Sequence, residues 1–250
     1  MKHPLRRALT RASYALLPPA LMKHRIGLRN WLHGEAEIRL LDVLVDPRRA
    51  AADVGAHLGA YTYFLVGRAA RVHAFEPQPW CARFLARAYG RAVTVHACAL
   101  SDHDGSGTLD MVDQGYQAFA AALDRRGPQA PDRRRVRIDV PVRTLDGFGF
   151  DDLGFVKIDA DGGELPILRG ARATLARCRP VLLVEIEQRN LSVPMQQVFD
   201  EIAAAGYRGE FLERGVRRPL ADFSLQAHQL ARLAGDRSRP YINNFIFLPD

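Results

Sequence analysis

The feature that most constrains the fold of this chain is a regular alternation, from residue 49 onward, of short apolar runs with longer amphipathic stretches. The apolar runs have the length of strands, and the stretches between them have the spacing of helices. We predict strands over 49–55, 70–77, 92–98, 154–162 and 179–188, and helices over 59–69, 80–90, 163–178 and 194–206. Repeated strand–helix units predict an α/β fold, in which helices cover both faces of a mostly parallel sheet.

Three segments depart from this alternation. Residues 34–46 have helical spacing that ends before Pro47, ahead of the first strand. Residues 104–146 are predicted to be an insertion, in which alternating strands flank a loop at 115–135 that is rich in Gly, Arg and Pro. The chain ends with predicted strands over 207–215 and 241–249, with no comparably strong helix between them. Strands joined without a crossover helix predict an antiparallel edge, which makes a sheet of about seven strands.

Charge separates a basic N-terminal arm, residues 1–33, from a domain over residues 34–250. The first 34 residues contain seven Lys or Arg and no Asp or Glu, and the whole chain has a net charge of +7, so the remainder is neutral. A neutral domain argues against a nucleic-acid binder. The arm could contact an anionic substrate or a membrane surface, or it could pack on the domain through Leu28, Trp31 and Leu32 with its arginines in solvent.

Cellular location follows from hydropathy and cysteine usage. No segment approaches the ~20 apolar residues that span a bilayer, and the apolar stretch at 12–22 is interrupted by two prolines. Cys81, Cys98 and Cys178 have no paired spacing, which argues for a reducing compartment and against disulfides or a zinc site. We expect a cytoplasmic protein without a metal, and peripheral contact with the inner face of the membrane through the arm stays open.

Ligands of parallel α/β sheets bind beyond the carboxyl ends of the strands. The first strand ends in DVGAHLG, which places Asp53, Gly55 and Gly59 there, and the second ends at Glu76. A carboxylate beside the first turn can accept hydrogen bonds from ribose hydroxyls. The turn lacks the G-x-G-x-x-G pattern of dinucleotide sites, which disfavours an NAD-dependent oxidoreductase as the alternative function.

Acidic residues also follow the fourth and fifth strands. They are Asp159, Asp161, Glu164, Glu185 and Glu187. Basic side chains or bare amides would suit a pyrophosphate, whereas these carboxylates suit a cationic nucleoside that carries an amino acid. Lys157 shares a sheet face with Asp159 and is expected to pair with the carboxylates.

His57 and Glu164 each have two interpretations. His57 could act as a base, but a residue in such a turn often has a left-handed backbone, which His, Asn and Asp tolerate better than most. We favour this structural role. Glu164 could assist catalysis, or it could simply be an acid in the first turn of a helix, where the helix dipole favours one.

Six segments, in order and spacing, resemble the FkbM family of S-adenosylmethionine-dependent methyltransferases. They are DVGAHLGAYT, VHAFEPQP, CALSDHDGSGTL, VPVRTLD, VKIDADGGELPILRGARATL and RPVLLVEIE, within roughly residues 34–190. The most specific part is K-I-D-x-[ED]-G-x-E. Two departures are His57, where the family commonly has Asn, and Asp161, where it commonly has Glu. The resemblance implies a Rossmann-like class I methyltransferase fold and S-adenosylmethionine as the cofactor.

The resemblance also implies roles for particular residues. The cofactor-binding residues that it implies are Asp53, Gly55, His57, Gly59, Tyr61, Glu76, Ala99, Leu100, Ser101 and Asp159. In this assignment Glu76 holds the ribose hydroxyls, and Ser101 with the backbone of Ala99 and Leu100 lies by the adenine. The catalytic candidates are Asp159, Glu164 and Asp161, since a base within hydrogen-bond reach helps an alcohol to accept a methyl group.

The predicted function is therefore O-methylation of a hydroxyl on a sugar, a glycolipid or polysaccharide, or a natural product, with a small molecule or glycan as the acceptor. Two alternatives remain besides the oxidoreductase. A nucleic-acid methyltransferase is disfavoured by the neutral domain and by the lack of an Asn-Pro-Pro-Tyr-type motif. A cofactor-binding fold without catalytic activity is conceivable because of His57 and Asp161, although Asp161 keeps the negative charge.

Overall fold

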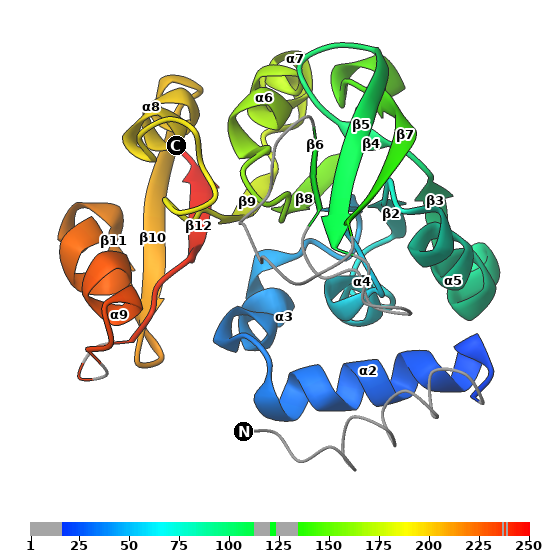
Figure 1. Ribbon diagram of the computed structural model, residues 1–250, viewed down its shortest axis with the longest axis horizontal. Helices are drawn as coiled ribbons and strands as arrows, with labels where there is room; N and C mark the ends of the chain where they lie inside the picture. The colour runs from blue at the N-terminus through cyan, green and yellow to red at the C-terminus, as the bar shows by residue number, and fades with distance from the viewer. Residues whose placement is uncertain (1–16, 113–120, 124–134, 237, 239) are drawn as a thin grey trace.

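The main sheet of the computed structural model follows the predicted alternation and adds one strand to it (Figure 1). The structure describes residues 17–112, 121–123, 135–236, 238 and 240–250. Across the eight-stranded sheet the order is β11-β10-β12-β9-β8-β1-β2-β3. The bounds are β1 Ala50–Val54, β2 Arg71–Phe75, β3 Thr94–His96, β8 Leu153–Ile158, β9 Val181–Glu185, β10 Tyr207–Glu213, β11 Val216–Pro219 and β12 Asn244–Pro249. The additional strand is β11, which forms a hairpin with β10.

Strand direction changes at one edge of this sheet, as predicted. Strands β3, β2, β1, β8 and β9 are mutually parallel, whereas β12 is antiparallel to both β9 and β10. The chain runs from β1 outward to β3 and then returns to β8 on the other side of β1. The strand order therefore reverses between β1 and β8, and ligands of such sheets bind at this reversal, beyond the carboxyl ends of the strands.

Helices cover both faces of the sheet, as Figure 1 shows. One face packs on α3 (Leu41–Leu44), α4 (Ala60–Leu65) and α5 (Pro79–Tyr89), and the other on α6 (Glu164–Arg169), α7 (Arg172–Cys178) and α8 (Gln196–Ala204). Successive residues of a strand point to opposite faces. In β1, Ala52 and Val54 belong to the core under α6–α8, and Ala51 to the core under α4 and α5. Buried side chains on both faces explain the continuous apolar runs of the sequence.

The insertion forms a second sheet beside the first. Its order is β4-β7-β5-β6, with bounds β4 Ala99–Leu100, β5 Gly105–Val112, β6 Ala121–Leu123 and β7 Arg135–Arg143. The predicted strand 92–98 is thus shortened, because the main sheet takes only Thr94–His96 and the chain then crosses to β4 in the second sheet. The predicted loop 115–135 contains β6, and its residues 115–120 and 124–134 lie outside the described part of the chain.

The predicted helices have shorter or divided counterparts. Helix 59–69 is reduced to α4, and 34–46 consists of η1 (Ala36–Leu40) and α3. Helix 163–178 is divided at Gly170, where a Cβ would lie 2.0 Å from the carbonyl oxygen of Ser101. Between β10 and β12 the chain forms β11 and the short helical segments η4 (Leu220–Asp222), η5 (Gln226–Leu230) and α9 (Ala231–Leu233). The remaining helical turns are η2 (Gly90–Ala92) and η3 (Asp146–Phe148).

The described part of the basic arm is a helix, α2 (Pro19–His33), that packs across α4 and α5. Its buried residues are Met22, Ile26 and Gly27, and a Cβ at Gly27 would lie 2.3 Å from the ring of Tyr63. Of the three residues considered for this contact, Leu28 and Leu32 are exposed, whereas the partly exposed ring of Trp31 lies 6.2 Å from the ring of Phe64, on α4. The helix turns the side opposite the two leucines to the domain.

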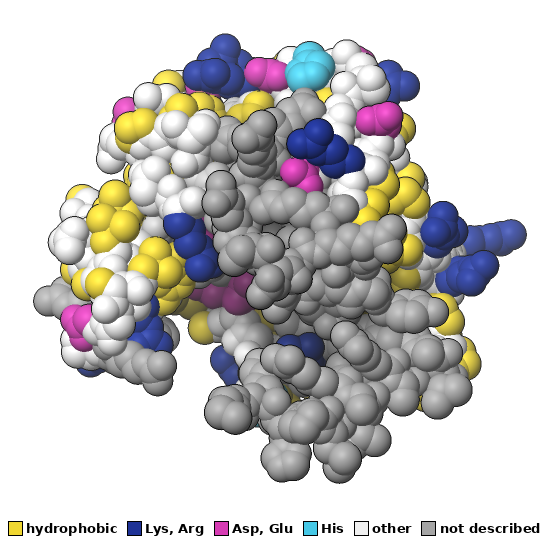
Figure 2. All heavy atoms as spheres, in the orientation of Figure 1, with side chains coloured by type: hydrophobic (Ala, Val, Ile, Leu, Met, Phe, Trp, Pro, Cys, Tyr) yellow, Lys and Arg dark blue, Asp and Glu magenta, His cyan; other side chains and the backbone are white. Residues whose placement is uncertain are grey.

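The surface carries charge of both signs. Figure 2 shows Lys and Arg side chains gathered at the edge of the molecule beyond α5, whereas acidic and basic side chains lie interspersed over much of the remaining described surface on this face. Helix α5 exposes Arg83 and Arg87, one turn apart. Within the described ranges, no helix is long and apolar enough to cross a membrane.

Candidate active site

The turn between β1 and α4 contains the first group of predicted site residues. Gly55 and Gly59 both have φ of 79°, and His57 has φ of 47°. His57 therefore has the left-handed backbone that its place in the turn predicts. The amides of Gly55 and Ala56 donate to the carbonyl oxygen of Phe75 at 3.0 and 3.1 Å, which holds the turn against the end of β2.

Gly55 is needed because two strand ends approach each other closely. A Cβ at this position would lie 1.8 Å from the carbonyl oxygen of Asp159, which follows β8. The amide of Asp159 in turn donates to the carbonyl oxygen of Val54 at 3.0 Å. The turn after β1 and the acidic loop after β8 thus meet at the reversal of strand order.

Asp53 lies just below this meeting point and is almost fully buried. Its carboxylate accepts a hydrogen bond of 2.5 Å from the hydroxyl of Thr62, on α4. Burial, with a smaller contribution from the charge of Asp159, raises the pKa of Asp53 to about 6, although the bond to Thr62 acts in the opposite direction. Asp53 is therefore anchored by the helix that follows it. Nothing in the sequence pattern had pointed to Thr62.

Glu76, at the end of β2, faces the same turn. Its two carboxylate oxygens accept bonds from the backbone amides of His57 at 2.7 Å and Gln78 at 2.8 Å. Burial raises the pKa of Glu76 to about 7. A carboxylate has about four acceptor positions, so two remain for the hydroxyls of a ribose. The side-chain oxygen of Gln78 is also buried beside it, and among the described residues it has no hydrogen-bond partner.

The predicted adenine-binding residues follow β3. Ala99 and Leu100 form β4, and both side chains are buried. The amide of Ser101 donates to the carbonyl oxygen of Arg143 at 2.9 Å, and its hydroxyl donates to Asp102 at 3.4 Å. Because Glu76 and Cys98 both donate through their amides to the carbonyl oxygen of His96, this segment starts directly beside Glu76. Contact with an adenine stays a prediction.

Lys157, in β8, lies completely buried beneath the site. Its ammonium donates to the side-chain oxygen of Asn244 at 3.3 Å and to the carbonyl oxygen of Ile158 at 3.2 Å, and it lies 5.1 Å from the centre of the Tyr61 ring. Burial lowers the pKa of Lys157, but the surrounding carboxylates, Asp159 above all, raise it by more. Lys157 is thus the buried positive charge that the carboxylates require.

Tyr61 connects the buried residues around Lys157 to the segment that follows α2. Its hydroxyl donates to a carboxylate oxygen of Glu35 at 2.5 Å. Burial, and then the charge of Glu35, raises the pKa of Tyr61 well above its usual value. Glu35 follows α2 by two residues, so the segment that joins the arm to the domain reaches the site. No local pattern indicates Glu35, because its partner lies 26 residues away on another element.

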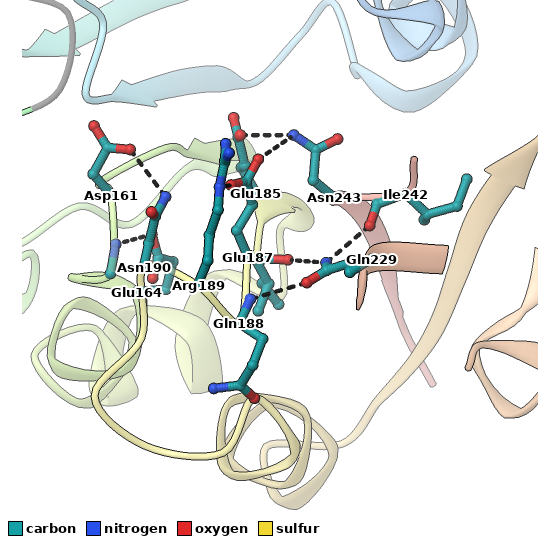
Figure 3. A network of polar contacts seen from close by, with 12 residues as sticks. Asp161, Glu164, Glu185, Glu187, Gln188, Arg189, Asn190, Gln229, Ile242 and Asn243 are labelled. Carbon is teal, nitrogen blue, oxygen red and sulfur yellow. Dashed lines mark hydrogen bonds and ion pairs between the residues drawn. The ribbon is translucent and has the colours of Figure 1, made fainter. Parts of the chain in front are cut away.

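The acidic residues after β8 and β9 form one polar network, shown in Figure 3. Asp161 accepts a bond of 3.2 Å from the side chain of Asn190, and Asn243 donates to Glu185 at 2.7 Å and to Glu187 at 3.2 Å. Arg189 pairs with Glu187. Burial and the charge of Asp159 raise the pKa of Glu185. The predicted carboxylates are thus held by the side chains of Asn190, Asn243 and Arg189, for which the sequence pattern has no signal.

Glu164 is the first residue of α6. This agrees with its interpretation as an acid in the first turn of a helix. One carboxylate oxygen accepts a bond from the amide of Gly162 at 3.0 Å. The other is buried and has no hydrogen-bond partner within the described part of the chain. Burial raises the pKa of Glu164 to about 7, with smaller contributions from Asp159 and Asp161. The residue therefore combines a structural bond with an unused acceptor.

The predicted residues consequently fall into two groups with Asp159 between them. Burial is the largest cause of the raised pKa values in both groups, and the charge of Asp159 adds to each. One group contains Asp53 and Glu76, and the other contains Glu164 and Glu185. In the described ranges, no three His, Cys, Asp or Glu side chains are placed to hold a metal ion. The three cysteines are buried and free.

The reversal of strand order, the glycine-bearing turn and the acid at the end of β2 define an α/β Rossmann-like methyltransferase fold. Residues 53–208 match the model of the methyltransferase FkbM domain. The chain therefore belongs to the FkbM methyltransferase family, and this membership implies S-adenosylmethionine as its cofactor. The buried acceptors at Glu76 and Gln78 fit a ribose, and the surrounding carboxylates fit a sulfonium cation.

Individual relatives agree with this assignment. The chain is 26% identical over 151 residues to the methyltransferase sdnD of Sordaria araneosa, and the match covers 47% of this chain and 58% of that protein. The structure resembles methyltransferase FkbM from Methylobacillus flagellatus with a TM-score of 0.52 and 19% identity, over 80% of this chain and 44% of that one. A protein from Clostridium thermocellum provisionally named an rRNA methylase has a TM-score of 0.50 and 10% identity, over 86% of this chain and 94% of that one. This chain thus spans little more than half of the curated relative, and the two structural matches show the fold alone.

Proposed function

We propose that this chain transfers the methyl group of S-adenosylmethionine to a hydroxyl oxygen of a sugar, a glycolipid or polysaccharide, or a natural product. The observation that carries this proposal is that the backbone of Asp159 abuts the turn after β1, while Asp161, two residues on, already belongs to the polar network of Figure 3. A hydroxyl acceptor needs groups that accept its proton and groups that orient it. Carboxylates and amides at the ends of β8 and β9 are of both kinds.

The chain's own residues would divide the work as follows. When bound, S-adenosylmethionine supplies a methyl group on a positively charged sulfur. Glu76 would hold the ribose hydroxyls with the acceptor positions that its two backbone bonds leave free. Asp159 would take the hydroxyl proton of the acceptor, because the loop it belongs to is fixed against Gly55. Lys157 would balance the negative charge of the carboxylates that surround it.

The acceptor would be oriented by the network after β9. Asn190 and Asn243 hold Asp161, Glu185 and Glu187 in place, and amide and carboxylate groups are of the kind that hydrogen-bond to hydroxyls. Much of the gain in rate is then alignment of the acceptor oxygen with the methyl group. Asp161 and Glu164 would adjust the local charge.

Replacement of Asp159 tests the proposed base. Asp159→Asn keeps the shape of the side chain but cannot take a proton, so we expect kcat to fall by roughly 10²-fold or more. Affinity for S-adenosylhomocysteine should change by less than about threefold, because the residue acts on the acceptor. The assay is transfer of labelled methyl from the cofactor to a panel of glycans and small polyols.

Asp200→Asn is the matched control, since Asp200 is exposed on α8 and bonds only to Gln196 among the contacts of the described residues. It should retain full activity. Full activity of Asp159→Asn would remove Asp159 as the base. Methyl transfer to amines and not to hydroxyls would contradict O-methylation while leaving the cofactor assignment intact.

A further inference from the structure

Helix α2 has apolar side chains on the side that faces away from the domain. Leu21, Leu28 and Leu32 are 58%, 60% and 57% exposed, whereas the Trp31 ring packs on the domain, 6.2 Å from the ring of Phe64 on α4. We call the three leucines the outer face of α2. Their spacing of seven and four residues places them on one side of a helix. Met22 and Ile26, which pack on the domain, lie on the opposite side.

Three large apolar residues on one side of a surface helix are not accounted for by folding of this domain. Single exposed apolar residues are common, but a contiguous group of them marks an interaction surface. Figure 1 shows α2 along the lower edge of the described part of the chain, outside α4 and α5, and the three leucines are exposed there. The outer face therefore fits a partner outside the domain.

Charge indicates what kind of partner this is. The helix and the residues before it contain seven Lys or Arg and no acid, and the remainder of the chain is neutral. Arg29 is exposed three residues before Leu32, so positive charge lies beside the apolar side chains. Exposed leucines flanked by bases are typical of helices that lie in the interface of a bilayer.

We propose that the outer face of α2 docks on the surface of an anionic lipid bilayer. The helix would lie parallel to the membrane, with Leu21, Leu28 and Leu32 inserted at the level of the headgroups and Arg29 near the lipid phosphates. A second copy of this chain fits less well, because it would bring another helix of the same charge against α2. The inference does not depend on the methyl acceptor proposed above.

Vesicle flotation with the full chain tests this proposal. The wild-type protein should float with vesicles of phosphatidylglycerol and phosphatidylcholine, and bind pure phosphatidylcholine at least about tenfold more weakly. Leu28→Asp should weaken binding to the anionic vesicles by about tenfold or more, because it removes inserted apolar surface and adds a negative charge. Arg29→Glu should weaken it severalfold, and higher salt should weaken the wild type.

Leu233→Asp is the matched control, because Leu233 is 47% exposed on α9, away from the helix in question. It should bind vesicles as the wild type does. Failure of the wild type to bind anionic vesicles would overturn the proposal. A dimer that Leu28→Asp converts to a monomer would assign the face to a second copy. If the wild type did not bind vesicles and Leu28→Asp lowered the unfolding temperature, the outer face of α2 would be assigned to residues 1–16 of the same chain.

Discussion

Two residues of the site, His57 and Asp161, have left-handed backbones, with φ of 47° and 45°. Such a conformation costs most side chains about 1–2 kcal/mol, and His, Asn and Asp adopt it more readily than others. Both are also the positions at which this chain departs from the residues that the family commonly has. The two substitutions therefore suit the backbone that each position requires. The left-handed backbone thus explains how a histidine is accommodated in the first turn.

His57 gives the first test at this scale. We expect His57→Asn to retain the stability and the cofactor affinity of the wild type, because Asn also tolerates the left-handed region. His57→Val should be less stable by about 1–2 kcal/mol, since a β-branched residue is strained there. Urea denaturation measures the difference. If His57→Asn lost turnover and the acidic limb of the pH–rate profile while keeping its stability, His57 would act as a base in addition to its backbone role.

At the scale of elements, the sequence predicted what depends on periodicity and on local turn chemistry. The five parallel strands, the antiparallel edge and the carboxylates at the strand ends follow from such patterns. Contacts between distant segments were not predictable. Gly170 divides a helix only because the backbone of Ser101 passes within contact distance. Likewise Glu35 contacts Tyr61 from the segment after α2, and Asn243 contacts Glu185 from the segment directly before β12. No local pattern records these approaches.

The contact between the β1 turn and the β8 loop leads to a second prediction. In Gly55→Ala the new Cβ would overlap the carbonyl oxygen of Asp159, so one of the two loops must move. We expect a loss of more than about 3 kcal/mol of stability, or a folded protein with cofactor affinity at least about tenfold lower. Chemical denaturation and calorimetric titration with S-adenosylhomocysteine distinguish these results.

Gly67 provides a matched control for this change. Its φ is 87°, close to that of Gly55, but a Cβ there would meet no atom within 4 Å. Gly67→Ala should therefore show only the conformational cost of about 1–2 kcal/mol and bind the cofactor normally. Equal effects of the two substitutions would mean that the approach of β1 to β8 is looser than the structure indicates.

At the scale of the whole molecule, charge is divided between a basic arm and an acidic site within a neutral domain. Burial is the main cause of the raised pKa values in that site, about 6 for Asp53 and about 7 for Glu76 and Glu164. At these three carboxyl groups the folded protein thus holds more protons than the unfolded chain between about pH 4 and 7. The stabilising contribution of these groups is complete below their unfolded pKa values and is lost as the pH rises through the folded ones. The free energy of unfolding of the ligand-free protein should therefore decrease across this window.

The same ionisation should favour the cofactor. S-adenosylmethionine and S-adenosylhomocysteine share every titrating group and differ in the positive charge on sulfur, so the ratio of their affinities reports the charge of the site. As Asp53, Glu76 and Glu164 ionise between pH 5.5 and 8, we expect the ratio to shift toward S-adenosylmethionine by about tenfold, a typical effect of one nearby charge in a partly buried site. Calorimetric titration of both ligands at the two pH values measures this. In Glu76→Gln the shift should shrink, because one titrating carboxyl is gone. A ratio independent of pH in the wild type would show that these carboxylates do not face the sulfonium.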